Sequence, residues 1–460
     1  STSDVAKLTA TSPDLDFTKG TTSGNGIVGL YLKGDTDISA YNKTITVGDT
    51  VVDAATGRDI APAIGIYSEK QGTSLSSPYV IKANIKTGTK AVGIFSAKGT
   101  DKSYIKYEGT QMDLGEGSTG FYVNGGTELA SPTINLDGGL VAYVTENSTF
   151  KGGTATINLT KSGIGVYGEK GAVVEVGTWH FNNNGHAAEE IRLKEGLAKI
   201  TTNKDLKPKM VLTHVINGET YLANGQTVTS ILDPAHPTIV QEENIGLMAQ
   251  GVKNPTAPAN ILATGGWKEA NYEITNYGTI DFKDSIKSTA IYAESARVKN
   301  DGTINLASST NVNAPNIGMY AEEVQITPAP APKTTLVTLE NNGTIEGGDK
   351  TVGIYGHNVN LGASSLTKVG AGGTGVYSKG GNVIINGGTL SVGENGTTGS
   401  NDAVGVYYVG GTGGAITSNA ADVKIGNSAY GFVVQNENGA AVTLTTNTPN
   451  VTLGEDAVYA

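Results

Sequence analysis

The histidines and tryptophans have the widest chemical repertoire in this sequence, and they are unevenly distributed. His180, His186, His214 and His236 fall within one stretch, whereas His357 stands apart. The spacings of 6, 28 and 22 residues between the first four match no common set of zinc ligands, and the absence of Cys excludes thiolate sites. We therefore predict that the protein holds no metal and no cofactor.

The same stretch is a candidate recognition surface. Aromatic rings and imidazoles offer contact area together with hydrogen bonds, and partner binding uses both. A structural flap that covers exposed core is the alternative interpretation. The candidate partner-binding residues are Trp179, His180, His186, His214, His236 and Trp267.

One glycine-rich run matches a nucleotide-binding fingerprint in its letters. Gly370-Ala371-Gly372-Gly373-Thr374-Gly375 has the spacing G-x-G-x-x-G. That fingerprint binds phosphate where a helix follows it, but Val376-Tyr377-Ser378 has the pattern of a strand. We therefore interpret the run as a corner between strands.

Catalysis by carboxylates needs acidic side chains that converge in one groove, as in enzymes that cleave polysaccharides. The candidates are Asp281, Asp284 and Glu294, or Glu189 and Glu190. Nothing in their spacing brings them together, and solvated surface charge is the simpler interpretation. The sequence also contains no G-x-S-x-G and no H-E-x-x-H motif. We predict that the protein is not an enzyme.

The overall charge narrows the class of partner. The chain has 43 acidic and 32 basic residues, and its net charge of −11 disfavours nucleic acids and anionic membranes. Residues 1–4 lack the basic region of a signal peptide, and the chain stops within a sequence repeat. We expect the sequence to be an excised part of a longer protein.

A short phrase recurs along the chain: aliphatic, Gly, aliphatic, aromatic. Most neighbouring copies lie 22 to 36 residues apart, a period typical of solenoids. The 64 Gly residues and the lack of a long helical period indicate an all-β structure. We predict a right-handed parallel β-helix. Full copies begin at Val28, Ile64, Val92, Ile164, Ile317, Val352 and Val404, and looser ones at Thr119, Ile245, Thr289, Thr374, Tyr430 and Asp456.

Strand alternation predicts which side chains of the phrase face the core. Both aliphatic residues should point inward, and the aromatic residue should point outward beside the Gly. We therefore expect the side chains of Ile64, Ile66, Val352, Ile354, Val404 and Val406 inside, and those of Tyr67, Tyr355 and Tyr407 outside.

A second phrase, Asn-x-Gly-Thr-(Ile/Leu), predicts the corners of the coils. It begins at Asn276, Asn300, Asn341 and Asn386. Asn and Gly tolerate positive φ and suit a sharp bend, and the Thr-Ile that follows starts a new strand.

The first phrase is missing between Tyr167 and Met248, so we divide the chain into β-helix coils over 1–178 and 244–460 and an insertion or irregular coils over 179–243. Residues 186–200 are charged and poor in Gly, which suggests one amphipathic helix. Proline also marks loops at 253–260 and 327–333, because proline cannot donate to a strand ladder. We predict that recognition, if this segment performs it, lies in 179–243 or in these loops.

The alternation of Asn-x-Gly-Thr-Ile with Ile-Gly-Met-Tyr-Ala-Glu, clearest over 300–322 and 341–355, resembles the passenger domains of large fusobacterial type Va autotransporter adhesins, which include arginine-inhibitable and galactose-sensitive members. The resemblance covers most of the chain outside 179–243. It implies a surface rod that is attached to the outer membrane by a C-terminal β-barrel not contained in this chain. It assigns no binding residues.

We therefore predict an extracellular adhesin segment that presents a protein- or glycan-binding surface to host cells or partner bacteria. A polysaccharide-acting enzyme on the same fold is one alternative. A structural spacer within a longer passenger is another.

Overall fold

A computed structural model describes residues 7–18, 26–34, 36–69, 72–96, 102–230, 240–251, 273–322, 338–396, 402–410, 414–436 and 441–460. Strands are the regular structure of these residues, and none of them forms a helix. Within these ranges no helical segment has the length and apolarity needed to cross a membrane. Residues 1–204 and 205–460 form two compact units, each described separately below.

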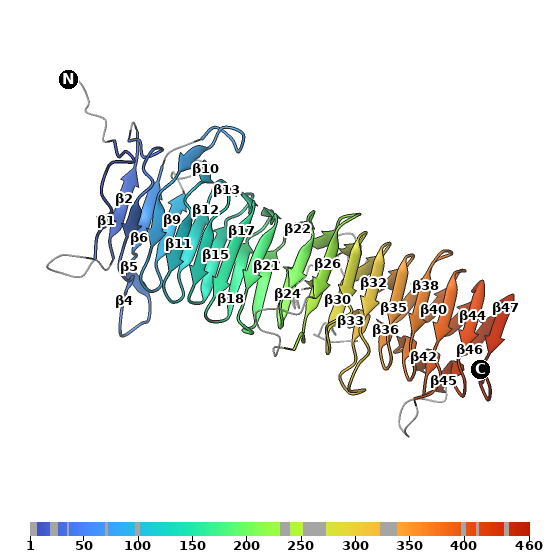
Figure 1. Cartoon of the computed structure of the whole chain (residues 1–460). Helices are drawn as coiled ribbons and strands as arrows, with labels where there is room; N and C mark the ends of the chain where they lie inside the picture. The colour runs from blue at the N-terminus through green and yellow to red at the C-terminus, as the bar shows by residue number, and fades with distance from the viewer. Residues whose placement is uncertain are drawn as a thin grey trace. The chain divides into compact units, whose positions relative to one another are not determined.

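In the first unit, strands from successive coils stack in parallel to form three ladders (Figure 1). The first ladder contains β2 (Val28–Leu32), β6 (Ile64–Ser68), β9 (Val92–Ser96), β12 (Thr119–Val123), β15 (Gly139–Val144), β18 (Gly163–Gly168) and β21 (Ala188–Lys194). The second contains β7 (Tyr79–Ile81), β10 (Ser103–Tyr107), β13 (Gly125–Leu129), β16 (Thr149–Lys151), β19 (Val173–Glu175) and β22 (Leu197–Ile200). The third contains β1 (Leu15–Asp16), β3 (Thr44–Thr46), β8 (Asn84–Lys86), β11 (Gln111–Leu114), β14 (Thr133–Leu136), β17 (Ala155–Leu159) and β20 (Trp179–Asn182). An antiparallel pair, β4 (Val51–Val52) and β5 (Asp59–Ala61), lies outside these ladders.

The second unit has the same three-ladder plan. Its first ladder contains β24 (Met210–Ile216), β27 (Ile245–Gln250), β30 (Thr289–Glu294), β33 (Ile317–Glu322), β36 (Val352–Gly356), β39 (Thr374–Ser378), β42 (Val404–Gly410) and β45 (Tyr430–Asn436). Its second contains β25 (Glu219–Leu222), β28 (Glu273–Asn276), β31 (Arg297–Asn300), β34 (Thr338–Asn341), β37 (Asn358–Leu361), β40 (Asn382–Ile385), β43 (Ala415–Ser418) and β46 (Thr443–Thr446). Its third contains β26 (Thr227–Ser230), β29 (Thr279–Phe282), β32 (Thr303–Leu306), β35 (Thr344–Gly347), β38 (Leu366–Val369), β41 (Thr389–Val392), β44 (Asp422–Ile425) and β47 (Asn450–Leu453).

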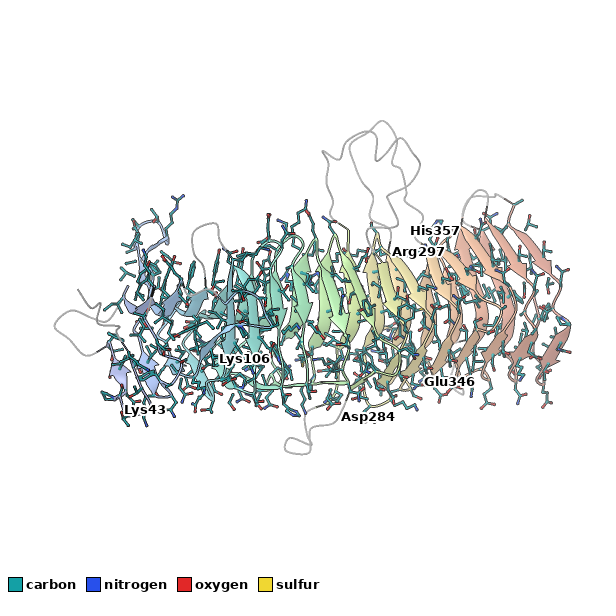
Figure 2. All side chains as sticks on the ribbon, turned by 90° about the horizontal axis from the view of Figure 1, so that it is seen from above. Lys43, Lys106, Asp284, Arg297, Glu346 and His357 are labelled. Carbon is teal, nitrogen blue, oxygen red and sulfur yellow. The ribbon has the colours of Figure 1, made fainter. Side chains whose placement is uncertain are left out.

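From β6 onward, each coil thus gives its strands in a fixed order, to the first ladder, then the second and then the third. Parallel stacking of this kind confirms the predicted all-β fold, a parallel β-helix. Apolar side chains from the three ladders fill the centre of the coils, and charged side chains such as Asp284, Arg297 and Glu346 lie at the periphery (Figure 2).

The predicted register of the recurring phrase is right at most of the named positions and wrong at Val352. Ile66, Ile354 and Val406, the second aliphatic residues, are fully buried, and Tyr355 is half-exposed, as expected. Among the first aliphatic residues, Ile64 is 6% and Val404 is 4% exposed, so both are buried as predicted. Val352 is half-exposed and lies on the outer side of β36, which corrects the prediction that it faces the core.

The glycine of the phrase explains this register. The strand pairs run Val352 with Thr374 and Ile354 with Val376, and they omit Gly353 between them. A Cβ on Gly353 would point inward, 3.2 Å from Cγ2 of the buried Thr367 and 2.6 Å from the carbonyl oxygen of Gly375 in the next coil. Gly353 and Ile354 therefore both face the interior, and the residue before them turns outward.

The predicted helix at 186–200 is wrong, because these residues form β21 and β22, which pair in parallel with β18 and β19. The phrase is missing there because other side chains fill its positions. Strand pairing aligns Glu189 with Ile164 and Arg192 with Tyr167, which places Glu190 at the position of Gly165. Residues 179–230 are thus coils of the β-helix and not an element that leaves it, while 231–239 fall outside the described residues.

The third ladder is nevertheless irregular in this region. The ladder that begins at β1 ends at β20, and another begins at β23 (Lys204–Leu206). Lys204 and Glu190 are both buried beside this break. One ladder is therefore interrupted at this place.

The Asn-x-Gly-Thr phrase forms corners as predicted. Asn276, Asn300 and Asn341 end β28, β31 and β34, and they are fully buried. Asn276 Nδ2 donates to Asn300 Oδ1 and Asn300 Nδ2 donates to Asn341 Oδ1, both at 2.8 Å. Asn386 differs, since it lies one residue beyond the end of β40 and is exposed.

Candidate functional site

The predicted recognition residues do not form one surface. Trp179 is 5% exposed, packs edge-on against Phe150, and donates from Nε1 to the Gly152 carbonyl at 2.9 Å, so it belongs to the core. His214 is also buried, and its Nε2 lies 2.7 Å from Gln250 Oε1. His180 and His186 are exposed.

The other predicted positions, His236 and Trp267, lie outside the described residues, as do the two proline-marked loops at 253–260 and 327–333. Across the part of the chain that the structure describes, no group of three His, Asp or Glu side chains could hold a metal ion.

The candidate catalytic carboxylates do not converge either. Asp281 lies on β29 in the third ladder, whereas Glu294 lies on β30 in the first ladder and accepts a hydrogen bond of 2.9 Å from the Tyr292 hydroxyl. Glu190 forms an ion pair with Lys204 inside the first unit. Glu189 Oε2 lies 3.7 Å from Arg192 Nε. In the fingerprint at Gly370–Gly375, residues 370–373 form the corner between β38 and β39, as predicted, and Thr374 and Gly375 begin β39.

Stacked aromatic rings run along the outer face of the first ladder in both units, and we call these rows the tyrosine ladders. In the first unit the row is Tyr31, Tyr67, Phe95, Tyr122, Tyr143 and Tyr167, with ring centroids 4.3–5.5 Å apart. In the second it is Tyr292, Tyr320, Tyr355, Tyr377 and Tyr407, at 4.9–5.3 Å. Each interior ring has both faces covered by its neighbours, so a sugar cannot stack on it.

The hydroxyls of several ladder tyrosines are bound to acidic side chains. Tyr143 donates to Glu169 at 2.8 Å, and Tyr320 donates to Glu322 at 3.2 Å. Burial, followed by the neighbouring carboxylate, raises the pKa of Tyr143, Tyr292 and Tyr320. The hydrogen bond to Glu69 is the main reason that the pKa of Tyr31 rises to about 12. These contacts are internal to the scaffold and leave those hydroxyls engaged.

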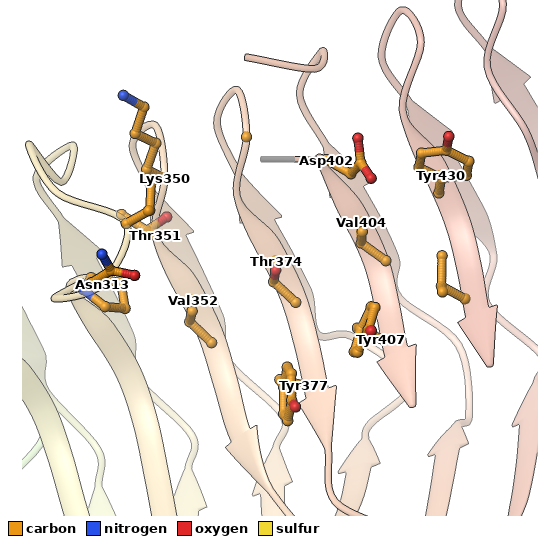
Figure 3. Close-up of a pocket in the computed structure, with 14 residues that line it drawn as sticks. Asn313, Lys350, Thr351, Val352, Thr374, Tyr377, Asp402, Val404, Tyr407 and Tyr430 are labelled. Atoms are coloured by element: carbon orange, nitrogen blue, oxygen red, sulfur yellow. The ribbon is translucent and has the colours of Figure 1, made fainter. Parts of the chain in front are cut away.

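A groove lies where the tyrosine ladder of the second unit ends, and we call it the ladder-end groove (Figure 3). Its floor is formed by Val352, Thr374 and Val404 of three successive coils, and Tyr377 and Tyr407 line one side. After Tyr407 the next coil carries Val433 instead of a ring, and Tyr430 takes the place of Val404.

The opposite side of the groove carries charged residues at the coil corners, Lys350 and Asp402. Val312, Asn313 and Pro315, from the loop between β32 and β33, line one end. The groove encloses about 520 Å³, within the range of roughly 300–1,000 Å³ found for small-ligand sites. Asp402 is the one acidic residue among its lining residues, so the lining offers no pair of carboxylates for glycoside cleavage. The arrangement suits binding.

Sequence reasoning missed this groove because it placed the first residue of each phrase in the core. The looser copies of the phrase indicate an outward direction for this position, because they place a polar side chain there, at Thr119, Thr289 and Thr374. A hydroxyl at a supposed core position is evidence that the position faces outward.

Comparison of the chain with protein-family models, with curated proteins and with solved structures gives no match.

Proposed function

We propose that this chain is a segment of a cell-surface adhesin, in which a parallel β-helix presents a binding surface to host cells or partner bacteria. The ladder-end groove is the observation that carries the proposal. It is recessed, of ligand size, and lined in part by half-exposed side chains such as Val352, Thr374 and Tyr430.

The chemistry of the described residues also favours binding over catalysis. The predicted catalytic carboxylates lie on different ladders or are engaged in ion pairs. The recurring phrase and the Asn-x-Gly-Thr corners resemble those of fusobacterial autotransporter passengers, which supports placement on the bacterial surface through a C-terminal barrel outside this sequence.

Binding of the purified, fluorescently labelled chain to epithelial cells and to other bacteria tests the proposal. We expect saturable binding to at least one cell type, which unlabelled chain should compete away. Circular dichroism should first show the β-rich spectrum of the folded protein. A folded chain that binds neither kind of cell would overturn the proposal and favour the structural spacer.

A further inference from the structure

We propose that the ladder-end groove binds a short oligosaccharide through side-chain hydrogen bonds over an aliphatic floor. This inference rests on the proposed adhesin function and names the ligand class of that site.

Four polar side chains of the groove lack partners among the described residues. They are the Asn313 amide, the Lys350 ammonium, the Thr374 hydroxyl and the Tyr430 hydroxyl, and no hydrogen bond or ion pair joins their side chains to another described residue. In the tyrosine ladders, by contrast, hydroxyls are bound to Glu169 in the first unit and to Glu294 and Glu322 in the second. The groove therefore concentrates unused donors and acceptors, which a ligand rich in hydroxyl groups can satisfy.

The backbone of the floor rules out the commonest mode of peptide binding. Strands β36, β39, β42 and β45 pair with one another in parallel, so their N–H and C=O groups are engaged in the ladder. An extended peptide gains affinity by adding a strand to a free sheet edge, and the groove offers the face of a sheet instead. A ligand here must bind through side chains.

The floor suits the apolar face of a sugar ring. Val352 supplies half-exposed aliphatic surface next to Thr374, and Val404 also lines the floor, although it is only 4% exposed. Four successive coils, from Val352 to Tyr430, give a groove about 14 Å long at ~4.8 Å per coil. That length accommodates a short linear oligosaccharide lying along the stack of coils.

The loop at one end of the groove is fixed before any ligand arrives. Asn316 is fully buried, and its backbone N–H donates to Ser309 Oγ at 2.7 Å. The Ser309 N–H donates to the Asp349 carbonyl at 2.8 Å, which ties the loop to the neighbouring coil. Such preorganisation lowers the entropic cost of binding.

The chain offers a matched pair of variants for the test. Thr374 and Thr289 are both half-exposed and occupy the same position of the phrase in the same ladder, but Thr289 does not line the groove. Thr374→Arg should fill the groove, and Thr289→Arg should leave it open. Tyr430→Phe removes one unpaired hydroxyl with little change of shape.

Binding of the full chain is measured on an array of neutral and acidic oligosaccharides, and the strongest hit is then titrated calorimetrically. We expect Thr374→Arg to weaken this binding at least tenfold, Tyr430→Phe to weaken it severalfold, and Thr289→Arg to retain it, with all three variants folded by circular dichroism. Equal binding by wild type and Thr374→Arg would overturn the groove assignment, and so would the absence of any bound oligosaccharide.

The cell-binding assay separates this inference from the proposed function. Cell binding by wild type without oligosaccharide binding would overturn the inference and leave the adhesin proposal standing. Absence of cell binding by the folded wild type would overturn the adhesin proposal itself.

Discussion

The Lys204 ammonium lies 2.6 Å from Glu190 Oε1 inside the first unit, where the two side chains are only 1% and 3% exposed. Glu190 occupies the position that Gly165 holds in the preceding coil. Lys204 also donates to the Gly177 carbonyl at 2.6 Å, so the charge is held by two acceptors.

Removing one partner of this pair should destabilise the fold strongly. Glu190→Ala leaves a buried ammonium, and we expect a loss of about 3–5 kcal/mol in the free energy of unfolding. Chemical denaturation followed by circular dichroism measures it. The exposed pair of Lys170 and Glu195, at 3.3 Å, is the control, because Lys170→Ala should cost less than about 1 kcal/mol. Equal losses for the two variants would contradict the structure.

Two aliphatic residues of one strand should respond differently to truncation. Ile354 is fully buried, and Ile354→Ala should cost about 2–5 kcal/mol through lost burial and a cavity. Val352 is half-exposed on the groove floor, so Val352→Ala should cost about 1 kcal/mol or less. Denaturation midpoints of the two variants test the corrected register, and a larger loss for Val352→Ala would refute it.

The buried amide row predicts a cost for losing one asparagine. Asn300→Ala removes the acceptor of Asn276 and the donor to Asn341, so we expect a loss of about 1–3 kcal/mol. Asn342, which bonds exposed or half-buried acidic side chains, is the control. Thermal unfolding of Asn300→Ala and Asn342→Ala should separate the two, and similar midpoints would argue against a buried row.

The tyrosine ladders predict a loss of stability in alkali. The pKa values of Tyr143, Tyr292 and Tyr320 are raised in the folded state, so the folded protein holds their protons more tightly than the unfolded chain. Their contribution is therefore fully present below about pH 10, the unfolded pKa of tyrosine, and is lost as the pH rises through the folded values.

Absorbance at 295 nm measures ionised tyrosine, and circular dichroism measures the loss of β-structure. We expect the ionisation of these ladder tyrosines and the loss of β-structure to occur together above pH 10. Tyr320→Phe should reduce the alkaline loss of stability, whereas Tyr277→Phe, at an exposed tyrosine outside the ladder, should not. Complete titration of all tyrosines near pH 10 without loss of structure would contradict the raised pKa values.

Much of the fold could be predicted from sequence because the recurring phrase fixes coil length and strand direction. The direction of the first aliphatic residue could not, since strict alternation ignores the bend at Gly353, where two successive residues face inward. The sequence left an insertion and irregular coils as alternatives for 179–243, because at β21 Glu190 and Arg192 replace the Gly and Tyr by which the phrase is recognised.

The candidate site could not be predicted from the sequence, for a related reason. Trp179 and the histidines were chosen by residue type, and residue type cannot tell the core position of Trp179 from the surface position of His180. The groove depends on residues from four coils, Val352, Thr374, Val404 and Tyr430, which become neighbours only through stacking.

The partial exposure of the first residue in most copies of the phrase has a consequence for how such a chain can diversify. Within one ladder that position holds Ile317, Val352, Thr374, Val404 and Tyr430, a range of polarity that the buried, apolar position two residues later does not show. Mutations at its half-exposed members, such as Val352, Thr374 and Tyr430, alter the surface while the packing beneath them is preserved. Repeated coils of this kind can therefore acquire new ligand specificities by single substitutions, and the same positions are the natural choice for engineering them.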